Sequence, residues 1–282
     1  MELVKRYVDE DLAEHWNINE SSKSFSKMLN HISITTNFKA HFEKELSYPS
    51  LFKAPKDTLI VADIGAGVGW TSAMIALRPE VKKVYVIEPS SNRLSRVPYV
   101  MKHFGVPESK YILINGGFEK LQIDEKINLA VLSSSFHHCF DNQMPTLFKN
   151  LKDLLLKDEQ FDFIDYHGEK KILNYKGKIL IASEHFVNLF WTARKIQKYF
   201  HNIIIKYTNP KNYDPKISFG NWRAPDPFDG EHHRTKREII KIFKKANFEF
   251  DFVLHDGHSC VGENWNKVSK SVKYYFAILN LK

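Results

Sequence analysis

The sequence predicts an α/β fold in which a mostly parallel β-sheet carries helices on both faces. The apolar run Leu59–Ile64 has the length of a buried strand, and a helical pattern follows it over residues 71–77. A second apolar run, Val84–Ile87, comes after that helix and completes a strand–helix–strand unit. Because such units pair their strands in parallel, they indicate an open sheet with helices packed on it.

A glycine-rich turn joins the first strand to the first helix. Its glycines are Gly65, Gly67 and Gly69, and Asp63 stands just before them. Side chains at the glycine positions would block a backbone that turns sharply and lies against a nucleoside, while the following helix directs free N–H groups at the same place. The turn closes one residue earlier than the dinucleotide fingerprint G-x-G-x-x-G. We therefore expect an adenosine-like ligand at this turn.

Glu88 ends the second apolar run, 19 residues after Gly69. In a strand–helix–strand unit, an acid at the end of the second strand lies beside the glycine turn, where its two oxygens can accept hydrogen bonds from both ribose hydroxyls. The turn and the acid thus predict the same ligand.

These two segments resemble the first and second motifs of the class I S-adenosylmethionine-dependent methyltransferases. The first is Val61–Gly69 and the second is Val86–Pro89, and the resemblance extends from about Leu59 to Glu184. It implies a seven-stranded, mostly parallel Rossmann-like sheet with an antiparallel last strand, helices on both faces and an N-terminal helical cap. Residues 1–50 would form the cap and residues 51–282 the methyltransferase domain, with an acceptor-side insert at about 203–233.

The resemblance also implies S-adenosylmethionine as the cofactor. The third strand, Tyr111–Ile114, leads into the loop that contacts adenine in family members, and Gly117 stands where the family usually has an aspartate. The cofactor-binding residues that the resemblance implies are Asp63, Gly65, Gly67, Gly69, Glu88, Phe118, Glu119 and Ser133.

The fourth strand, Leu129–Leu132, ends in three serines followed by Phe136, His137 and His138. In open α/β sheets, ligands bind outside the carboxyl ends of the strands. A histidine there can take a proton from an acceptor hydroxyl, since its pKa near ~6.5 suits general-base work at neutral pH. One of the pair can instead serve to orient the loop through hydrogen bonds, and both interpretations stay open.

Further candidates follow the fifth strand, Gly177–Ala182. The segments after it are predicted as a helix over 186–200, a long polar loop over 207–229, and a helix over 236–245 that Thr235 caps. The candidate catalytic residues are His137, His138, His185 and His232. The candidate acceptor-binding residues are Trp16, Glu184, Trp222, Arg223, His233 and Arg234.

Three more segments carry specific expectations. Residues 3–46 show helical patterning, which fits either a lid over the methyl donor or a helix pair packed on the sheet edge. A helix is expected over 93–104 with a kink at Pro98, and residues 158–167 are expected to form a surface loop. The last two apolar runs, 248–254 and 272–279, resemble the closing antiparallel hairpin of the family.

Composition limits the partners and the location of the protein. The 282-residue chain has a formal net charge of +8, but its lysines are scattered, which favours solvated surface over an RNA track. It has no run near the ~18 apolar residues of a membrane span, no apolar signal core at its start and two cysteines. We expect a cytoplasmic protein that binds neither a membrane nor nucleic acid, and the sequence leaves its oligomeric state open.

The thirteen histidines suggest no metal motif. The adjacent pairs His137–His138 and His232–His233 point apart on a regular element, and neither has the H-E-x-x-H spacing that places two ligands on one helix face. The sequence therefore predicts a catalytic site without a metal.

The function predicted from these residues is S-adenosylmethionine-dependent methyl transfer to a small polar metabolite. An oxygen acceptor is favoured, and a sugar or a phosphorylated molecule fits the polar candidates near the carboxyl edge. Two alternatives remain: an RNA methyltransferase, which the net charge favours, and a non-catalytic scaffold of methyltransferase fold.

Overall fold

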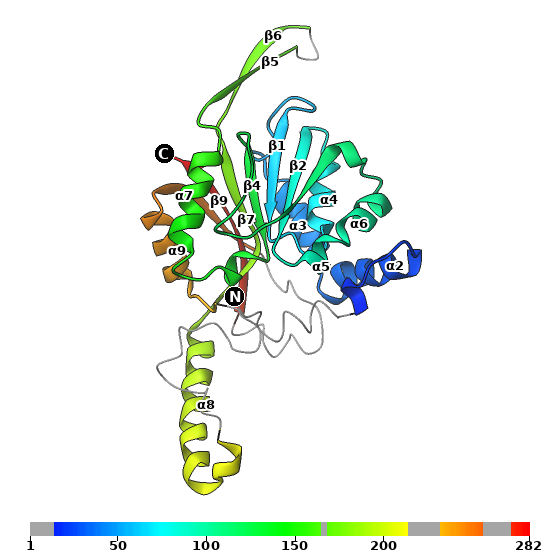
Figure 1. Cartoon of the computed structure of the whole chain (residues 1–282). Coiled ribbons are helices and arrows are strands. Elements are labelled where there is room, and N and C mark those ends of the chain that lie inside the picture. The colour runs from blue at the N-terminus through cyan, green and yellow to red at the C-terminus, as the bar shows by residue number, and fades with distance from the viewer. Residues whose placement is uncertain (1–13, 165–167, 214–231, 256–271) are drawn as a thin grey trace.

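The computed structural model describes residues 14–164, 168–213, 232–255 and 272–282, and its centre is a β-sheet of seven strands in the order β3-β2-β1-β4-β7-β9-β8 (Figure 1). These strands are β1 (Leu59–Ile64), β2 (Val81–Glu88), β3 (Tyr111–Asn115), β4 (Leu129–Ser133), β7 (Lys178–Val187), β8 (Phe248–Leu254) and β9 (Val272–Leu281). Pairing is parallel from β3 to β7, and β9 runs antiparallel to both neighbours. The predicted fold class is confirmed.

Helices cover both faces of this sheet (Figure 1). The described helices that supply buried residues to the core on one face are α2 (Ser22–Asn30), α3 (Phe38–Leu46), α4 (Trp70–Ala76) and α6 (Val97–Phe104). On the other face the core takes residues from α7 (Met144–Leu154) and α9 (Lys236–Lys245). Burial of the central strands on both sides explains why β1 and β4 are apolar at most positions.

Short helical turns connect these elements. They are η1 (Glu14–Trp16), the π-helix η2 (His31–Thr35), α5 (Ser91–Leu94), η3 (Glu108–Lys110), η4 (Phe136–His138) and η5 (Pro210–Asn212). The predicted kinked helix over 93–104 is wrong, because α5 and α6 are separate and Pro98 lies in the first turn of α6. Proline fits there because the first turn of a helix leaves its N–H groups unbonded.

Two elements extend away from the sheet (Figure 1). The expected surface loop at 158–167 is wrong for its described part, which forms an antiparallel hairpin of β5 (Glu159–Ile164) and β6 (Lys170–Tyr175). The expected helix over 186–200 starts later and ends later, as α8 (Leu189–Thr208). Strand β7 continues to Val187 because β9 pairs with it over that length. Part of the expected loop over 207–229 is thus helix α8, and residues 214–231 lie outside the description.

Local sequence signals at α9 are confirmed. Thr235 caps the helix: its hydroxyl accepts a hydrogen bond from the N–H of Glu238, and the Glu238 side chain accepts one from the N–H of Thr235. Among the described helices, none has the length and apolar character needed to cross a membrane.

Candidate active site at the carboxyl edge of the sheet

The parallel order of the sheet brings four strand ends to one edge. Strands β2, β1, β4 and β7 are neighbours, so the segments that follow them lie together at their carboxyl ends (Figure 1). The glycine turn follows β1, Glu88 ends β2, the histidine pair follows β4, and Glu184 and His185 belong to the last part of β7. This is the edge at which open α/β sheets bind ligands.

The three glycines of the turn all have positive φ angles: 74° at Gly65, 58° at Gly67 and 85° at Gly69. A Cβ atom at Gly65 would lie 2.6 Å from the Cβ of Ser135, and one at Gly69 would lie 2.8 Å from Cγ1 of Val97. Glycine is therefore required at these two positions by the protein's own packing. A Cβ at Gly67 would meet nothing within 4 Å, so the backbone at Gly67 borders open space that a ligand can enter.

Glu88 fixes the glycine turn through its carboxylate. Its Oε2 accepts a hydrogen bond from the N–H of Gly67 at 2.8 Å, and its Oε1 accepts one from the N–H of Ser90 at 2.9 Å. The carboxylate oxygens of Glu88 are therefore held beside the backbone of the turn. Sequence reasoning predicted the ligand contact but missed this bond to the turn.

Asp63 lies beneath the turn and is fully buried. Its Oδ2 accepts hydrogen bonds from the hydroxyls of Thr71 and Ser72 in α4, at 2.7 and 2.6 Å. Burial raises the pKa of Asp63 to about 6, although both hydroxyl bonds lower it. Its Oδ1 has no hydrogen-bond partner among the described residues, and a ligand ammonium is a group that could satisfy it.

The other cofactor candidates lie on either side of this turn. Phe118 follows β3 and packs against the core, and Glu119 is exposed and accepts a hydrogen bond from Gln143 at 3.0 Å. Ser133 ends β4, and its buried hydroxyl makes no hydrogen bond within the described part of the chain. Ser133 thus has a buried hydroxyl without a partner among the described residues, and Glu119 has an exposed carboxylate.

The loop after β4 is fixed to both neighbouring strands. The Ser134 hydroxyl donates to the carbonyl of Ser183 in β7 at 2.9 Å, and the Ser135 hydroxyl donates to the carbonyl of Ile64 in β1 at 2.7 Å. Ser134 has a φ of 48°, a left-handed conformation that non-glycine residues adopt rarely. These constraints determine where His137 and His138 stand.

His137 pairs with Glu184 across 47 residues of sequence. The His137 Nδ1 lies 2.9 Å from Oε2 of Glu184, and Oε1 of Glu184 accepts a hydrogen bond from the N–H of Phe136 at 2.7 Å. Glu184 is almost fully buried, and burial raises its pKa to about 7. The two residues therefore form a buried, hydrogen-bonded pair.

Three more histidine rings surround this pair. The ring centroid of His137 lies 4.0 Å from that of His138 and 4.9 Å from that of His185, and the His185 ring lies 6.0 Å from that of His233. We call His137, His138, Glu184, His185 and His233 the histidine cluster. Burial, and after it the neighbouring His137, lowers the pKa of His185 to about 4, so this imidazole is neutral at pH 7.

His232 and Arg234 mainly support the loop after β4. The N–H of His232 donates to the carbonyl of His137 at 2.8 Å, and its ring packs edge-on against Phe140. Burial lowers the pKa of His232 to about 4. The Arg234 guanidinium donates to the carbonyl of Cys139 at 2.7 Å and to Oδ1 of Asp141 at 2.8 Å. The predicted acceptor-binding guanidinium is thus engaged by the protein itself.

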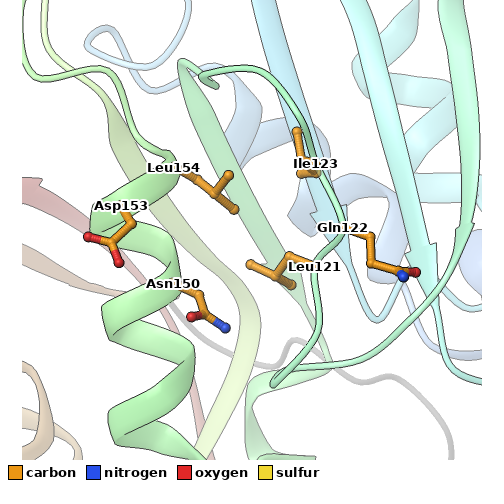
Figure 2. A pocket seen from close by; sticks show the side chains of 6 residues that line it. All are labelled: Leu121, Gln122, Ile123, Asn150, Asp153 and Leu154. Atoms are coloured by element: carbon orange, nitrogen blue, oxygen red, sulfur yellow. The ribbon is translucent and has the colours of Figure 1, made fainter.

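The remaining candidates are Trp16, Trp222 and Arg223. Trp16 is half-buried in η1, where its carbonyl accepts a hydrogen bond from Arg96 at 2.8 Å. Trp222 and Arg223 lie outside the described residues. A hollow of about 300 Å³ lies between residues 121–123 and α7, and Figure 2 shows its lining side chains. It contains none of the candidate residues.

Sequence reasoning missed Glu45, a fully buried acid of α3. Its Oε1 accepts a hydrogen bond from the N–H of Ser183 at 2.8 Å, its Oε2 accepts one from the Ser183 hydroxyl at 3.0 Å, and the Nε2 of His255 lies 2.6 Å from Oε1. Ser183 lies at the irregularity in β7 between Ile181 and Glu184 and has a φ of 49°. The signal available in the sequence was an acid on the face of α3 that also carries Phe42 and Leu46.

The chain was compared with known protein families, curated proteins and solved structures. Residues 61–158 match a family described as a methyltransferase domain, and no curated protein matches the chain. Among solved structures, the chain is similar to geranyl diphosphate C-methyltransferase from Streptomyces coelicolor A3(2), whose structure contains Mg²⁺, geranyl diphosphate and S-adenosyl-L-homocysteine. The TM-score is 0.57 at 11% identity, covering 95% of this chain and 87% of that one.

Two further structures share the fold. One is magnesium protoporphyrin IX methyltransferase from Synechocystis PCC 6803 with bound S-adenosylmethionine, at a TM-score of 0.51 and 9% identity, covering 98% of this chain and 91% of that one. The other is a putative O-methyltransferase from Nostoc punctiforme PCC 73102, at a TM-score of 0.52 and 15% identity, covering 92% of this chain and 58% of that one. Residues 61–158, which include the glycine turn beside Glu88, thus match a methyltransferase domain, and the chain shares the Rossmann-like fold of these S-adenosylmethionine-dependent methyltransferases.

Proposed function

We propose that this protein transfers the methyl group of S-adenosylmethionine to a small acceptor bound beside the histidine cluster, with an acceptor oxygen favoured. The observation that carries the proposal is the position of His137, at the carboxyl edge of β4 and paired with Glu184, next to the strand that bears the glycine turn. A donor site and a group that can accept a proton are thereby held by neighbouring strands.

The residues around the turn fit the donor. Glu88 is a hydrogen-bond acceptor beside the turn, the Gly67 backbone borders open space, and the Oδ1 of Asp63, which has no partner among the described residues, suits an ammonium group. When bound, S-adenosylmethionine supplies an electrophilic methyl group on a sulfonium. The protein's contribution is then to hold the acceptor in line with the methyl group and to exclude competing water.

A hydroxyl acceptor must also lose a proton. When Nδ1 of His137 donates to Glu184, the lone pair of the ring is on Nε2, and that nitrogen takes the proton as the new oxygen–carbon bond forms. The carboxylate then stabilises the resulting imidazolium, since Glu184 keeps its hydrogen bond from the N–H of Phe136. The buried Glu184 is therefore a positioning residue for His137.

The polar side chains of the histidine cluster favour a polar acceptor. The histidine cluster supplies four imidazole rings and one carboxylate, which can hydrogen-bond the hydroxyls of a sugar or a phosphorylated metabolite. The net charge of +8 leaves RNA as the alternative substrate.

Donor binding is the first test. Titration calorimetry with S-adenosylmethionine, S-adenosylhomocysteine and NAD is expected to give micromolar binding of the first two and none of NAD. Binding of NAD alone would overturn the proposal. A screen of sugars, phosphorylated metabolites and bulk RNA with radiolabelled donor then identifies the acceptor, and labelling of RNA alone would favour the alternative.

The histidine is tested once an acceptor is known. We expect His137→Ala to lower kcat by ~10²-fold with the affinity for S-adenosylhomocysteine unchanged, because it removes the proton acceptor and not the donor site. His232→Ala is the matched comparison, since it alters the same loop without removing a member of the cluster. A kcat of His137→Ala within about threefold of the wild type would leave positioning, with proton loss to water, as the better account.

A further inference from the structure

We propose that His137, Glu184 and His185 form a binding site for a divalent transition-metal ion. Each of the three offers one ligand atom, and these atoms lie within 4.8 Å of one another. Among the described residues this is the one group of three or more histidine, cysteine or acidic side chains that converges in this way. The proposal goes beyond methyl transfer, because binding of the ion requires neither donor nor acceptor.

The distances suit a single ion. Two ligand atoms that each lie about 2.1 Å from a metal and subtend a right angle are about 3.0 Å apart. The Nδ1 of His137 and the Oε2 of Glu184 are separated by 2.9 Å. An ion can therefore replace the proton between them with little movement of either side chain. His185 supplies the third ligand from the adjacent position in β7.

The protein holds these ligands in place before any ion arrives. The other oxygen of Glu184 accepts a hydrogen bond from the N–H of Phe136, which fixes the carboxylate. The main chain just before Glu184 is fixed as well, because Ser183 is bonded to Glu45 through both its N–H and its hydroxyl. Such supporting contacts orient ligands and strengthen metal binding.

The ligand types select the class of ion. Two imidazoles and one carboxylate suit Zn²⁺, Fe²⁺, Mn²⁺ or Co²⁺, whereas Mg²⁺ and Ca²⁺ prefer sites made of oxygen atoms. Three protein ligands leave coordination positions open, as catalytic metal sites require. The rings of His138 and His233 border the site, at 4.0 Å from the His137 ring and 6.0 Å from the His185 ring.

A second buried pair provides the comparison within the same molecule. Glu45 and His255 lie 2.6 Å apart, and the ring of His41 is 4.4 Å from that of His255. Yet Glu45 already accepts two hydrogen bonds from Ser183, and its neighbours do not converge as the three ligands at Glu184 do. We infer a metal site at Glu184 and a structural contact at Glu45.

The consequence for catalysis rests on the proposed function. An ion held by His137, Glu184 and His185 would lower the pKa of an acceptor hydroxyl beside it and would so assist the loss of its proton.

Metal binding is tested with Co²⁺ as the probe on the full chain after dialysis against EDTA, by its visible absorption and by calorimetry. We expect one saturable equivalent that Zn²⁺ displaces. Glu184→Gln and His185→Asn are expected to weaken binding by at least about tenfold. His255→Asn, the matched control at the other buried pair, is expected to bind as the wild type does. Absence of saturable binding, or equal binding by all four proteins, would overturn the proposal.

Folding of the variants is checked by circular dichroism in EDTA. Should His185→Asn fail to fold, His185→Cys replaces it: this variant keeps a metal ligand and is expected to add a thiolate-to-cobalt charge-transfer band. A cysteine variant that folds and shows no such band contradicts the proposal. Binding of S-adenosylhomocysteine in EDTA is measured in parallel, so that loss of the metal site and loss of the donor site are distinguished.

Discussion

Single buried acids do much of the positioning in this protein. Asp63, Glu88 and Glu184 stand at the carboxyl ends of β1, β2 and in β7, and each accepts hydrogen bonds from a neighbouring loop or helix. A buried carboxylate that lacked such donors would be costly, so these acids and their donors fix one another. The candidate ligand groups are therefore held by the same contacts that hold the loops.

Asp63 predicts a pH dependence of stability. Its pKa is raised in the folded state, from 3.8 to about 6, so the folded protein binds this proton more tightly than the unfolded chain. The protonated Asp63 therefore stabilises the folded protein fully below pH 3.8, and this contribution is lost as the pH rises through about 6. A shift of this size corresponds to about 3 kcal/mol.

Asp63→Asn tests this contribution because the amide oxygen can still accept from Thr71 and Ser72 but does not titrate. Urea unfolding at pH 4 and pH 6.5 is expected to show that the wild type loses about 2 kcal/mol relative to the variant over this interval, since at pH 4 the stabilisation is already below its full value. A difference between the two proteins that stays constant across the interval would show that the pKa of Asp63 is not raised.

Glu88 predicts the strength of donor binding. We expect Glu88→Ala to weaken binding of S-adenosylhomocysteine by about 1.5–3 kcal/mol, because it removes hydrogen bonds to a charged group and frees the Gly67 backbone. Titration calorimetry measures the change. Glu80→Ala, just before the other end of β2, is the control and is expected to leave the affinity unchanged. Equal affinities for both variants would remove Glu88 from the donor site.

At the scale of elements, the glycine turn combines two separate requirements. All three glycines need positive φ, but Gly69 is also pressed against Val97 of α6, whereas Gly67 faces open space. A substitution in one turn can therefore act mainly on folding or mainly on the ligand, depending on its position.

Alanine substitutions separate these requirements. An alanine in left-handed backbone is expected to lower the free energy of unfolding of each variant by about 1–2 kcal/mol. Gly69→Ala is expected to lose about 1–3 kcal/mol more, because its Cβ would clash with Val97. Gly67→Ala is expected to remain the more stable of the two variants. For the same loss of stability, it is expected to lose more of its affinity for the donor than Gly69→Ala does. Thermal unfolding and calorimetry measure the two effects. A more stable Gly69→Ala variant would contradict the packing argument.

At the scale of the molecule, Glu45 ties the N-terminal helices to the centre of the sheet. It joins α3 to Ser183 of β7 and to His255 at the end of β8, while Phe42 and Leu46 of α3 enter the core. This contact lies one residue before Glu184, so the helical segment and the histidine cluster share one support.

We expect Glu45→Ala to destabilise the protein by about 3–5 kcal/mol, because Ser183 and His255 would lose a buried partner. Amide exchange in α3 should become faster. Glu43→Ala is the control: Glu43 is an exposed residue of the same helix, paired with Lys39, and the change is expected to alter stability by less than about 1 kcal/mol. An equal loss of stability in both variants would show that the buried contact of Glu45 with Ser183 and His255 does not hold α3 in place.

The sequence by itself determined the sheet, the glycine turn and the acid of β2. These features depend on local patterns: apolar runs are continuous where strands are buried on both faces, and the left-handed backbone at Gly65, Gly67 and Gly69 favours glycine. Residues close in sequence specify such features, so a single sequence suffices. The same holds for the cap at Thr235.

Only the tertiary structure decided which polar groups meet. His137 and Glu184 are 47 residues apart, and their contact follows from the pairing of β4 with β7 and from the irregularity of β7 before Glu184. The sequence-based judgement on metals considered spacing within one helix, whereas these three ligands come from the ends of two neighbouring strands. Strand pairing is a long-range property, and for that reason the chemistry of the acceptor side could not be derived from local pattern.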